Sequence, residues 1–347
     1  MRVGIYTHYA HCDQAYLAIR LVEFLRSRGV DFDLYSDTPP GKLGLPYDKI
    51  VAHRGLIKFT EWAKKQSAIV WTHVPKIEQI NYANRINKIT SLAPMWQELV
   101  PPFRKAMRRA NSVVALSTEC HELYKDVYKL RNALLIPYDS GLPITRKELR
   151  VNQRQVKIFL PWFDRNARCA NGDFLGALGF VIERMPEATL TVAITSSKFS
   201  PAIAKFFQTL GVRTGGRVSV IRRANITDRL NLFAAHDLTI YPAECDNFGN
   251  CLLTSINCGT PVLTFAVSPQ IDFVYQDANG LLIKTKTDYD ENGVPHAIPE
   301  YDEFLRAMQT MIAEPWHIDN LNNRITYNLS ARRKAFEMGW SAALGLT

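Results

Sequence analysis

Short apolar segments, each the length of a buried strand, alternate with amphipathic helical segments along the first half of the 347-residue chain. Such alternation predicts β-α-β units, in which parallel strands form a sheet that helices cover. The expected strands of this half are 2–6, 31–36, 49–53, 68–73, 112–117 and 133–137. The expected helices are 14–29, 101–111 and 118–130.

A polar stretch at 138–155 interrupts the alternation, and a second series begins after it. Its expected strands are 156–161, 189–194, 218–222 and 238–242, and its expected helices are 172–185, 201–211 and 226–236. Two such series predict an α/β protein with two doubly wound, Rossmann-like domains, 1–155 and 156–320. A C-terminal helix at 321–347 is expected to pack back toward the first domain. Because open α/β sheets bind ligands at the carboxyl ends of their strands, we expect the domains to face each other across a cleft that holds the site.

Composition and segment lengths exclude several classes of protein. The chain is 47% hydrophobic and 22% charged, which is typical of globular proteins. No apolar run reaches the roughly 18 residues that a membrane span needs, and the N-terminus lacks the apolar core of a signal peptide. The 6 cysteines form no CxxC pair and have no zinc-site spacing with histidine. We therefore expect a cytoplasmic protein (in the host cytoplasm if the chain is viral) without a structural metal.

The positive charge is concentrated in the first half of the chain. The formal net charge is +9, and residues 1–155 carry 24 Lys+Arg against 14 Asp+Glu. The remaining residues carry 18 basic and 19 acidic side chains, so they contribute no excess. This asymmetry predicts an anionic partner for the first domain. A solvated basic face without a partner is the alternative.

The stretch from Tyr241 to Phe265 reads as a strand end, a polar turn, a helix, a Gly-Thr-Pro break and another strand. It resembles the donor-binding segment of retaining glycosyltransferases of the family 4 type, which have the GT-B fold of two Rossmann-like domains. Ten residues fall on that pattern without a gap, and six of them are identical to it. These ten are Pro242, Asp246, Asn247, Phe248, Gly249, Thr254, Ser255, Gly259, Pro261 and Val262.

The resemblance implies roles for the turn and for the helix that follows it. The helix N-terminus at Phe248–Asn250 would bind the diphosphate of a nucleotide-sugar, and Asp246 would contact the sugar hydroxyls. Thr254 stands where the family has the glutamate that holds the ribose, so that contact changes, and Glu244 is a candidate replacement. The alternative without a ligand is that Asp246 or Asn247 only caps the helix.

Two further regions resemble the donor site of the same family. Arg165 matches a family arginine, and Arg168 is a candidate to replace the family lysine, because Asn171 stands at its position. Cations there would neutralise the departing diphosphate. In the first domain, His73 matches the histidine that approaches the donor sugar. The other implied contacts of this domain, to donor or acceptor, come from His11, Asp13 and His53.

The acceptor is predicted from basic residues of the first domain that are interleaved with aromatic ones. Such a mixture suits a phosphate backbone and an unstacked base. The expected acceptor-binding residues are His11, Asp13, His53, Arg54, Trp96, Arg104, Lys105, Arg108 and Arg109.

The sequence therefore predicts a metal-independent retaining glycosyltransferase whose co-substrate is a nucleotide-sugar such as UDP-glucose, with no further cofactor. Asp246, His73 and Arg165 are the expected catalytic residues. The favoured acceptor is a hydroxymethylated pyrimidine in DNA, as in phage DNA glycosyltransferases, with the base flipped toward the cleft. An anionic membrane lipid or glycan is one alternative. A non-catalytic nucleic-acid-binding protein with the same fold is another.

Overall fold

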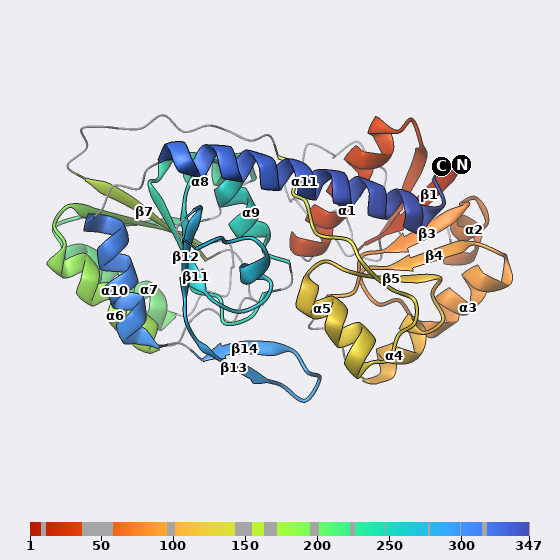
Figure 1. Ribbon diagram of the computed structural model, residues 1–347, viewed down its shortest axis with the longest axis horizontal. Coiled ribbons are helices and arrows are strands. Elements are labelled where there is room, and N and C mark those ends of the chain that lie inside the picture. Colours follow the sequence, from red (N-terminus) through yellow and green to blue (C-terminus); the bar gives the residue numbers. More distant parts are fainter. Residues whose placement is uncertain are drawn as a thin grey trace. The chain divides into compact units, whose positions relative to one another are not determined.

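The computed structural model describes residues 1–7, 12–36, 58–95, 101–142, 155–162, 172–194, 201–222, 226–246, 248–276, 278–298, 300–313 and 318–346. The chain divides into two compact units, each built around its own β-sheet (Figure 1). Unit 1 contains Met1–Gly141, Asp290–Val294 and Ser330–Thr347, and unit 2 contains Leu142–Tyr289 and Pro295–Leu329. Among the described residues, no helix is long and apolar enough to cross a membrane.

The sheet of unit 1 has six parallel strands in the order β2-β1-β3-β4-β5-β6. The strands are β1 (Arg2–Tyr6), β2 (Asp31–Tyr35), β3 (Ala68–Trp71), β4 (Ile89–Leu92), β5 (Ser112–Ala115) and β6 (Ala133–Leu135). β3 and β5 are buried along their whole length, as expected for strands with helices on both faces. From β1 the chain adds β2 on one side and β3 to β6 on the other, so the strand order reverses between β1 and β3.

The helices of unit 1 cover both faces of this sheet. They are α1 (Cys12–Ser27), α2 (Phe59–Lys64), α3 (Ile77–Arg85), α4 (Pro101–Met107) and α5 (Thr118–Glu122), which continues into the π-helical turn η2 (Leu123–Val127). Because crossovers between parallel strands are right-handed, the reversal of strand order places α1 on one face and α2 to α5 on the other. The last part of α11 (Ile318–Leu344) joins α1, where Phe336 packs edge-on against Phe24.

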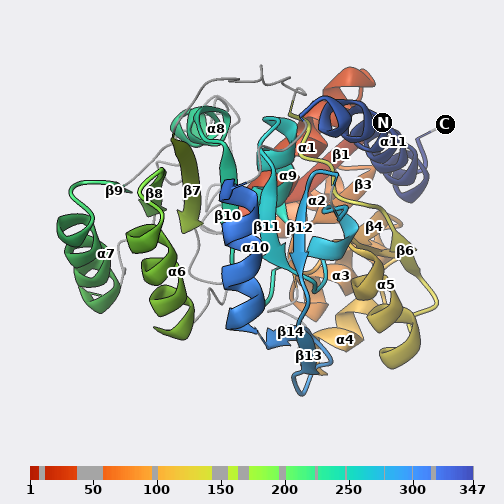
Figure 2. The same ribbon diagram turned by 60° about the vertical axis from the view of Figure 1, so that its left-hand side comes forward.

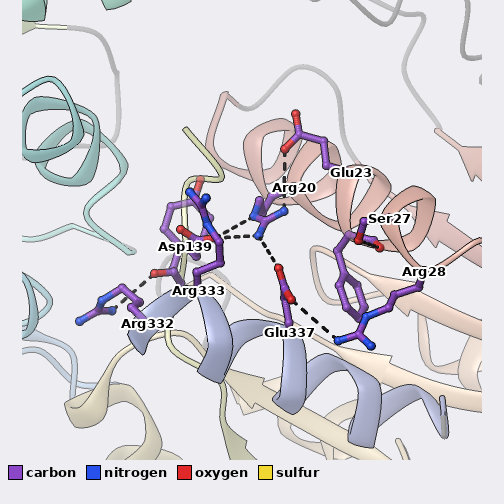
Figure 3. A network of polar contacts seen from close by, with 10 residues as sticks. Arg20, Glu23, Ser27, Arg28, Asp139, Arg332, Arg333 and Glu337 are labelled. Atoms are coloured by element: carbon purple, nitrogen blue, oxygen red, sulfur yellow. Dashed lines mark hydrogen bonds and ion pairs between the residues drawn. The ribbon is translucent and has the colours of Figure 1, made fainter. Parts of the chain in front are cut away.

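A buried ion-pair network joins α1, the segment after β6, and α11 within unit 1 (Figure 3). Arg20 donates from Nε and Nη2 to Oδ2 of Asp139 over 2.9 and 2.7 Å. Arg333 lies 3.4 Å from the same oxygen, and Glu337 lies 3.6 Å from Arg20. The Asp139 side chain is only 3% exposed. A carboxylate buried this deeply needs charged partners, and two arginines provide them.

The sheet of unit 2 also has six parallel strands, in the order β12-β11-β10-β7-β8-β9 (Figure 2). They are β7 (Val156–Trp162), β8 (Ala188–Ile194), β9 (Val218–Arg222), β10 (Leu238–Tyr241), β11 (Val262–Phe265) and β12 (Gly280–Ile283). Here the strand order reverses between β7 and β10. A separate antiparallel hairpin consists of β13 (Lys286–Tyr289) and β14 (Pro295–Ile298).

Successive residues of β7 face opposite layers of helices, as the two-residue period of a strand requires. The helices of unit 2 are α6 (Gly172–Arg184), α7 (Pro201–Arg213), α8 (Ile226–Ala235), α9 (Asn250–Asn257), α10 (Tyr301–Ala313) and the 3-10 helix η3 (Gln270–Asp272). Ile158 and Leu160 belong to the core cluster that contains residues of α6, α7 and α10. Phe159 belongs instead to the cluster with Phe233 of α8.

The two doubly wound sheets confirm the predicted fold class. In unit 1, α2, α3 and β4 were not predicted, while the expected strand at 49–53 lies outside the described residues. β4 was missed because its sequence, Ile-Thr-Ser-Leu, is half polar. The buried hydroxyls of Thr90 and Ser91 bond to the side chains of Asn111 and Ser112, over 2.9 and 2.8 Å.

Along the sequence, unit 1 gives way to unit 2 at Gly141–Leu142, whereas the predicted domain boundary lies after residue 155. The intervening residues 143–154 lie outside the described ranges. The long C-terminal helix begins at Ile318, and its residues from Ser330 onward belong to unit 1.

Candidate functional site

In each unit, one loop follows a strand at the point where the strand order reverses. We call the edge of a sheet where its parallel strands end the carboxyl edge, and the opposite one the amino edge. Open α/β sheets bind ligands at the carboxyl edge, beside such a reversal. In unit 2 the relevant strands are β7 and β10, which end at Trp162 and Tyr241. The predicted donor residues Arg165 and Arg168 follow β7 but lie outside the described residues.

Residues 242–249, here called the β10–α9 loop, follow β10, and hydrogen bonds from three elements hold their start. Thr264 of β11 donates its hydroxyl to the Tyr241 carbonyl over 2.7 Å. The fully buried Gln270 donates its side-chain amide to the Ala243 carbonyl over 2.9 Å. The backbone N–H of Ala297 in β14 donates to the Glu244 carbonyl over 2.8 Å. The backbone that leads to Asp246 is therefore fixed by groups far away in the sequence.

Asp246 is a buried carboxylate, 7% exposed, on this loop. The hydroxyl of Tyr241 donates to Asp246 Oδ2 over 2.7 Å, in a buried contact. A carboxylate can accept about four hydrogen bonds, so the tyrosine uses only part of its capacity. The contact thus helps to hold the Asp246 side chain in one orientation.

Gly249 sits immediately before α9 and needs to be glycine for two reasons. Its backbone is in the left-handed region, with φ 67° and ψ 33°, which side chains with a Cβ rarely adopt. A Cβ placed there would also lie 2.5 Å from Cε2 of Phe273. The glycine therefore lets the chain turn sharply into α9. The N-terminus of a helix directs backbone N–H groups and a positive dipole end outward, which favours an anion.

The other predicted donor residues of this region differ in what their side chains do. Phe248 is buried in the core, and Asn250 is also buried. Thr254 donates its hydroxyl to the Asn250 carbonyl over 2.7 Å, so its remaining capacity is that of an acceptor. Glu244 is half-buried, while Asn247 lies outside the described residues.

In unit 1 the strand order reverses between β1 and β3, and His73 follows the end of β3. His73 is 3% exposed, and its ring packs edge-on against Tyr6 with centroids 4.8 Å apart. The hydroxyl of Thr72 donates to that of Thr7 over 2.7 Å and ties the two strand ends together. His73 therefore lies at the carboxyl edge of its sheet. Asp13 lies in the first turn of α1, while His11, His53, Arg54 and Trp96 lie outside the described residues.

The predicted acceptor residues of α4 do not gather at this carboxyl edge. Arg104 is half-buried with its guanidinium 4.0 Å from the centre of the Tyr128 ring, and Lys105 is exposed. Burial raises the pKa of Tyr128, and the charge of Arg104 opposes that shift. Arg108 donates to the Tyr128 carbonyl over 3.4 Å, and Arg109 donates to the Asn81 side chain.

Arg108 and Arg109 follow the end of α4 and precede β5, which places them at the amino edge of the sheet. The structure therefore does not bring Arg108 and Arg109 together with His73, and their acceptor role stays a prediction. The physical reason is that a helix between parallel strands runs back across the sheet. Its start is therefore at the carboxyl edge and its end at the amino edge. Counting basic residues along the sequence does not show at which edge of the sheet each of them lies.

Three buried residues that support the β10–α9 loop were not predicted: Tyr241, Thr264 and Gln270. Tyr241 offered a weak signal, because it ends an apolar strand directly before the motif. Gln270 and Thr264 donate hydrogen bonds to backbone carbonyls of other segments. Such contacts leave no spacing pattern in the sequence.

A scan against protein-family models and a search of curated proteins find no match for the chain. Among solved structures it is similar to lipopolysaccharide outer core galactosyltransferase WaaB, with a TM-score of 0.70, 11% identity and 99% of each chain covered. A glycosyltransferase from Rickettsia africae ESF-5 aligns with a TM-score of 0.72 and 10% identity, over 100% of this chain and 99% of that one. Anabaena Alr3699/HepE in complex with UDP and glucose aligns with a TM-score of 0.64 and 14% identity, over 100% of both chains. These matches show the GT-B fold.

Proposed function

We propose that this protein is a glycosyltransferase that uses a nucleotide-sugar donor. The observation that carries the proposal is the position of the β10–α9 loop. The sequence pattern that resembles a donor-binding segment lies at the carboxyl edge of unit 2, beside the reversal of strand order, where open α/β sheets bind ligands. The whole-chain likeness to a HepE structure that contains UDP and glucose supports the same class of ligand.

The groups of unit 2 suit the separate parts of such a donor. The N-terminus of α9, together with Arg165 and Arg168, would bind the diphosphate. Asp246, held in one orientation by Tyr241, would accept hydrogen bonds from the sugar hydroxyls. His73, at the carboxyl edge of unit 1, remains a proposed catalytic residue that would donate to a sugar hydroxyl.

We propose transfer with retention of configuration, as the resemblance implies. The bond between the anomeric carbon and the diphosphate oxygen breaks while the acceptor oxygen bonds to that carbon on the same face. The acceptor proton passes to the departing diphosphate, so the protein does not have to supply a strong base. The cationic groups and the helix dipole stabilise the charge that develops on the leaving group.

We further propose that the acceptor is a hydroxymethylated pyrimidine in DNA. The charge of the first domain supports it, since 24 basic against 14 acidic residues in 1–155 favour an anionic partner. Because Arg108 and Arg109 lie at the amino edge, they would contact flanking DNA and not the reacting base.

The experiment is a transfer assay that follows nucleotide release and product mass with UDP-glucose and related donors. The acceptors are DNA with and without hydroxymethylated pyrimidines. We expect turnover with a hydroxymethylated acceptor, and a loss of about 100-fold or more in Asp246→Ala and Arg165→Ala with DNA retention unchanged. Asp302→Ala, an exposed change on α10, is the matched control and should keep full activity.

The outcomes separate the alternatives. Full turnover in Asp246→Ala removes the site assignment. Turnover on anionic lipid or glycan but not on DNA replaces the acceptor. DNA retention without turnover of any donor shows a non-catalytic nucleic-acid-binding protein and overturns the proposed function.

A further inference from the structure

The amino edge of unit 1 carries a row of basic residues on the face covered by α2 to α5. Four connections there run from the end of a helix to the start of the next strand, at 64–67, 85–88, 107–111 and 127–132. They contain eight basic residues and no acidic one: Lys64, Lys65, Arg85, Lys88, Arg108, Arg109, Lys129 and Arg131. All are exposed except Lys88, which is half-buried. We call these four connections the basic edge.

Hydrogen bonds show that the four connections are neighbours and form one continuous surface. Lys88 donates its ammonium to the Lys64 carbonyl over 3.2 Å, which joins the first two connections. Asn84 donates its side chain to the Arg109 carbonyl over 2.7 Å and ties α3 to the third. Asn132 donates to the carbonyls of Met107 and Ala110, which joins the last two. The order of the connections thus follows the order of the strands.

Helix geometry alone does not account for this row. A cation at a helix C-terminus stabilises the helix by about 0.3–1 kcal/mol, so some basic residues are expected at any amino edge. The amino edge of unit 2 provides the comparison. Its connections, at 184–187, 213–217, 235–237 and 257–261, contain three basic residues and two acidic ones.

The three basic residues of the unit 2 edge also have partners within the chain. Arg184 stacks on Phe180, and Arg213 forms an ion pair with Glu183 at 3.0 Å. Arg217 donates to the carbonyls of Met185 and Ala188. Lys88, Arg108 and Arg109 of the basic edge also donate hydrogen bonds within the chain, but none of its eight basic residues forms an ion pair with a described residue. Uncompensated charge on one surface attracts an anionic partner.

The side chains between the cations favour nucleic acid over a bilayer. Exposed asparagines, Asn87 and Asn111, lie within or beside the connections, and amide groups donate readily to phosphate oxygens. Val127, at 58% exposed, is the one large apolar side chain that the four connections expose. A surface that binds membranes combines its cations with several exposed apolar or aromatic residues.

The same residues favour a duplex over a single strand. Proteins that hold single-stranded nucleic acid stack its bases on exposed aromatic rings. The one aromatic residue in the four connections, Tyr128, is buried. Neighbouring helices pack about 8–10 Å apart, so the row extends over roughly 30 Å. A duplex presents one phosphate charge per about 1.7 Å of its axis, which supplies enough phosphates for every cation.

We propose that the basic edge binds the phosphate backbone of double-stranded DNA without sequence preference. This surface lies at the opposite edge of the sheet from His73, so it holds DNA and is not the place where a reacting base is bound. The proposal goes beyond the proposed function and does not depend on it, because binding to the backbone requires neither a donor nor a hydroxymethylated base.

The test is the binding of an unmodified 30-base-pair duplex, measured by fluorescence anisotropy between 50 and 300 mM salt without any donor. The edge variant combines Lys65→Gln, Arg85→Gln and Arg131→Gln, three exposed residues whose side chains form no hydrogen bond or ion pair with a described residue. The control variant, Lys205→Gln with Lys284→Gln and Lys286→Gln, removes the same charge from exposed positions of unit 2. Thermal melting checks that both remain folded.

We expect wild-type affinity to fall steeply with salt, and the slope of log affinity against log salt to become shallower by about 3 in the edge variant. The control variant should keep the wild-type slope. Equal slopes in the edge variant and the wild type overturn the proposal, as do equal losses in the edge and control variants. Absence of DNA binding also overturns it, whether or not the protein binds vesicles of anionic lipid.

Discussion

The β10–α9 loop of unit 2 and the basic edge of unit 1 are two candidate binding regions built in opposite ways. The loop has little exposed charge, and buried hydrogen bonds fix its backbone at Tyr241, Ala243 and Glu244. The basic edge carries eight basic side chains, seven of them exposed, and such side chains are long and flexible. The first arrangement fixes the positions of a few hydrogen-bonding groups, while the second produces a positive electrostatic potential over a whole surface.

This difference determines which kind of ligand each region can recognise. A sugar is discriminated by hydrogen bonds of defined length and direction, which require groups that are immobilised before binding. A phosphate backbone requires only many cations on one surface, because the release of counterions supplies the affinity. Changes in the loop should therefore alter specificity and rate, whereas changes at the basic edge should alter DNA affinity and its salt dependence.

The largest effect on stability is expected at the buried carboxylate of Asp139. Its charge is paired inside unit 1, unlike the exposed charges of the basic edge. Asp139→Ala leaves Arg20 buried without its main partner, and such a change costs about 3–5 kcal/mol of unfolding free energy. Denaturant unfolding measures it. Asp31→Ala, an exposed change on β2, should cost no more than about 0.5 kcal/mol. If both variants are equally stable, the network of Figure 3 does not stabilise unit 1.

A smaller loss of stability is expected from Gly249→Ala. The substitution combines a strained left-handed backbone with a contact 2.5 Å from Phe273, and we expect about 1–3 kcal/mol of destabilisation together with weaker donor binding. Gly215→Ala is the matched control, because Gly215 has φ 63° but no atom within 4 Å of a Cβ. It should show the backbone strain alone. Equal unfolding free energies in the two variants would mean that the contact with Phe273 costs nothing.

The smallest effect is expected from Tyr241→Phe, which removes one hydrogen bond to Asp246. A loss of about 1 kcal/mol, or roughly fivefold to tenfold in transfer rate, is expected. A transfer assay at saturating donor measures the loss.

Two comparisons decide whether Tyr241 acts through Asp246. In an Asp246→Asn background, Tyr241→Phe should cause little further loss, because the two residues form one unit. Tyr82→Phe, which removes an exposed tyrosine hydrogen bond in unit 1, should leave the transfer rate unchanged. Additive losses in the double variant would show that the two residues contribute separately.

The sequence predicted the fold well because the alternation of strands and helices is a local pattern. Prediction was weaker where polar groups are buried. Strand β4 was not predicted, because the hydroxyls of Thr90 and Ser91 form hydrogen bonds with side chains of other elements. The position of Gly249 at the start of α9 could be predicted, because the sequence motif requires glycine where the backbone turns with a positive φ. The location of Arg108 and Arg109 at the amino edge could not be predicted, because it depends on which edge of the sheet the end of α4 reaches.

The central claim is that the carboxyl edge of unit 2 holds a nucleotide-sugar. The most direct measurement is amide hydrogen exchange, compared with and without a saturating nucleotide-sugar from a panel that includes UDP-glucose. We predict that at least one member protects residues 242–256, which contain the β10–α9 loop and most of α9, while the basic edge exchanges as before. No protection of residues 242–256 by any member of the panel would contradict the claim.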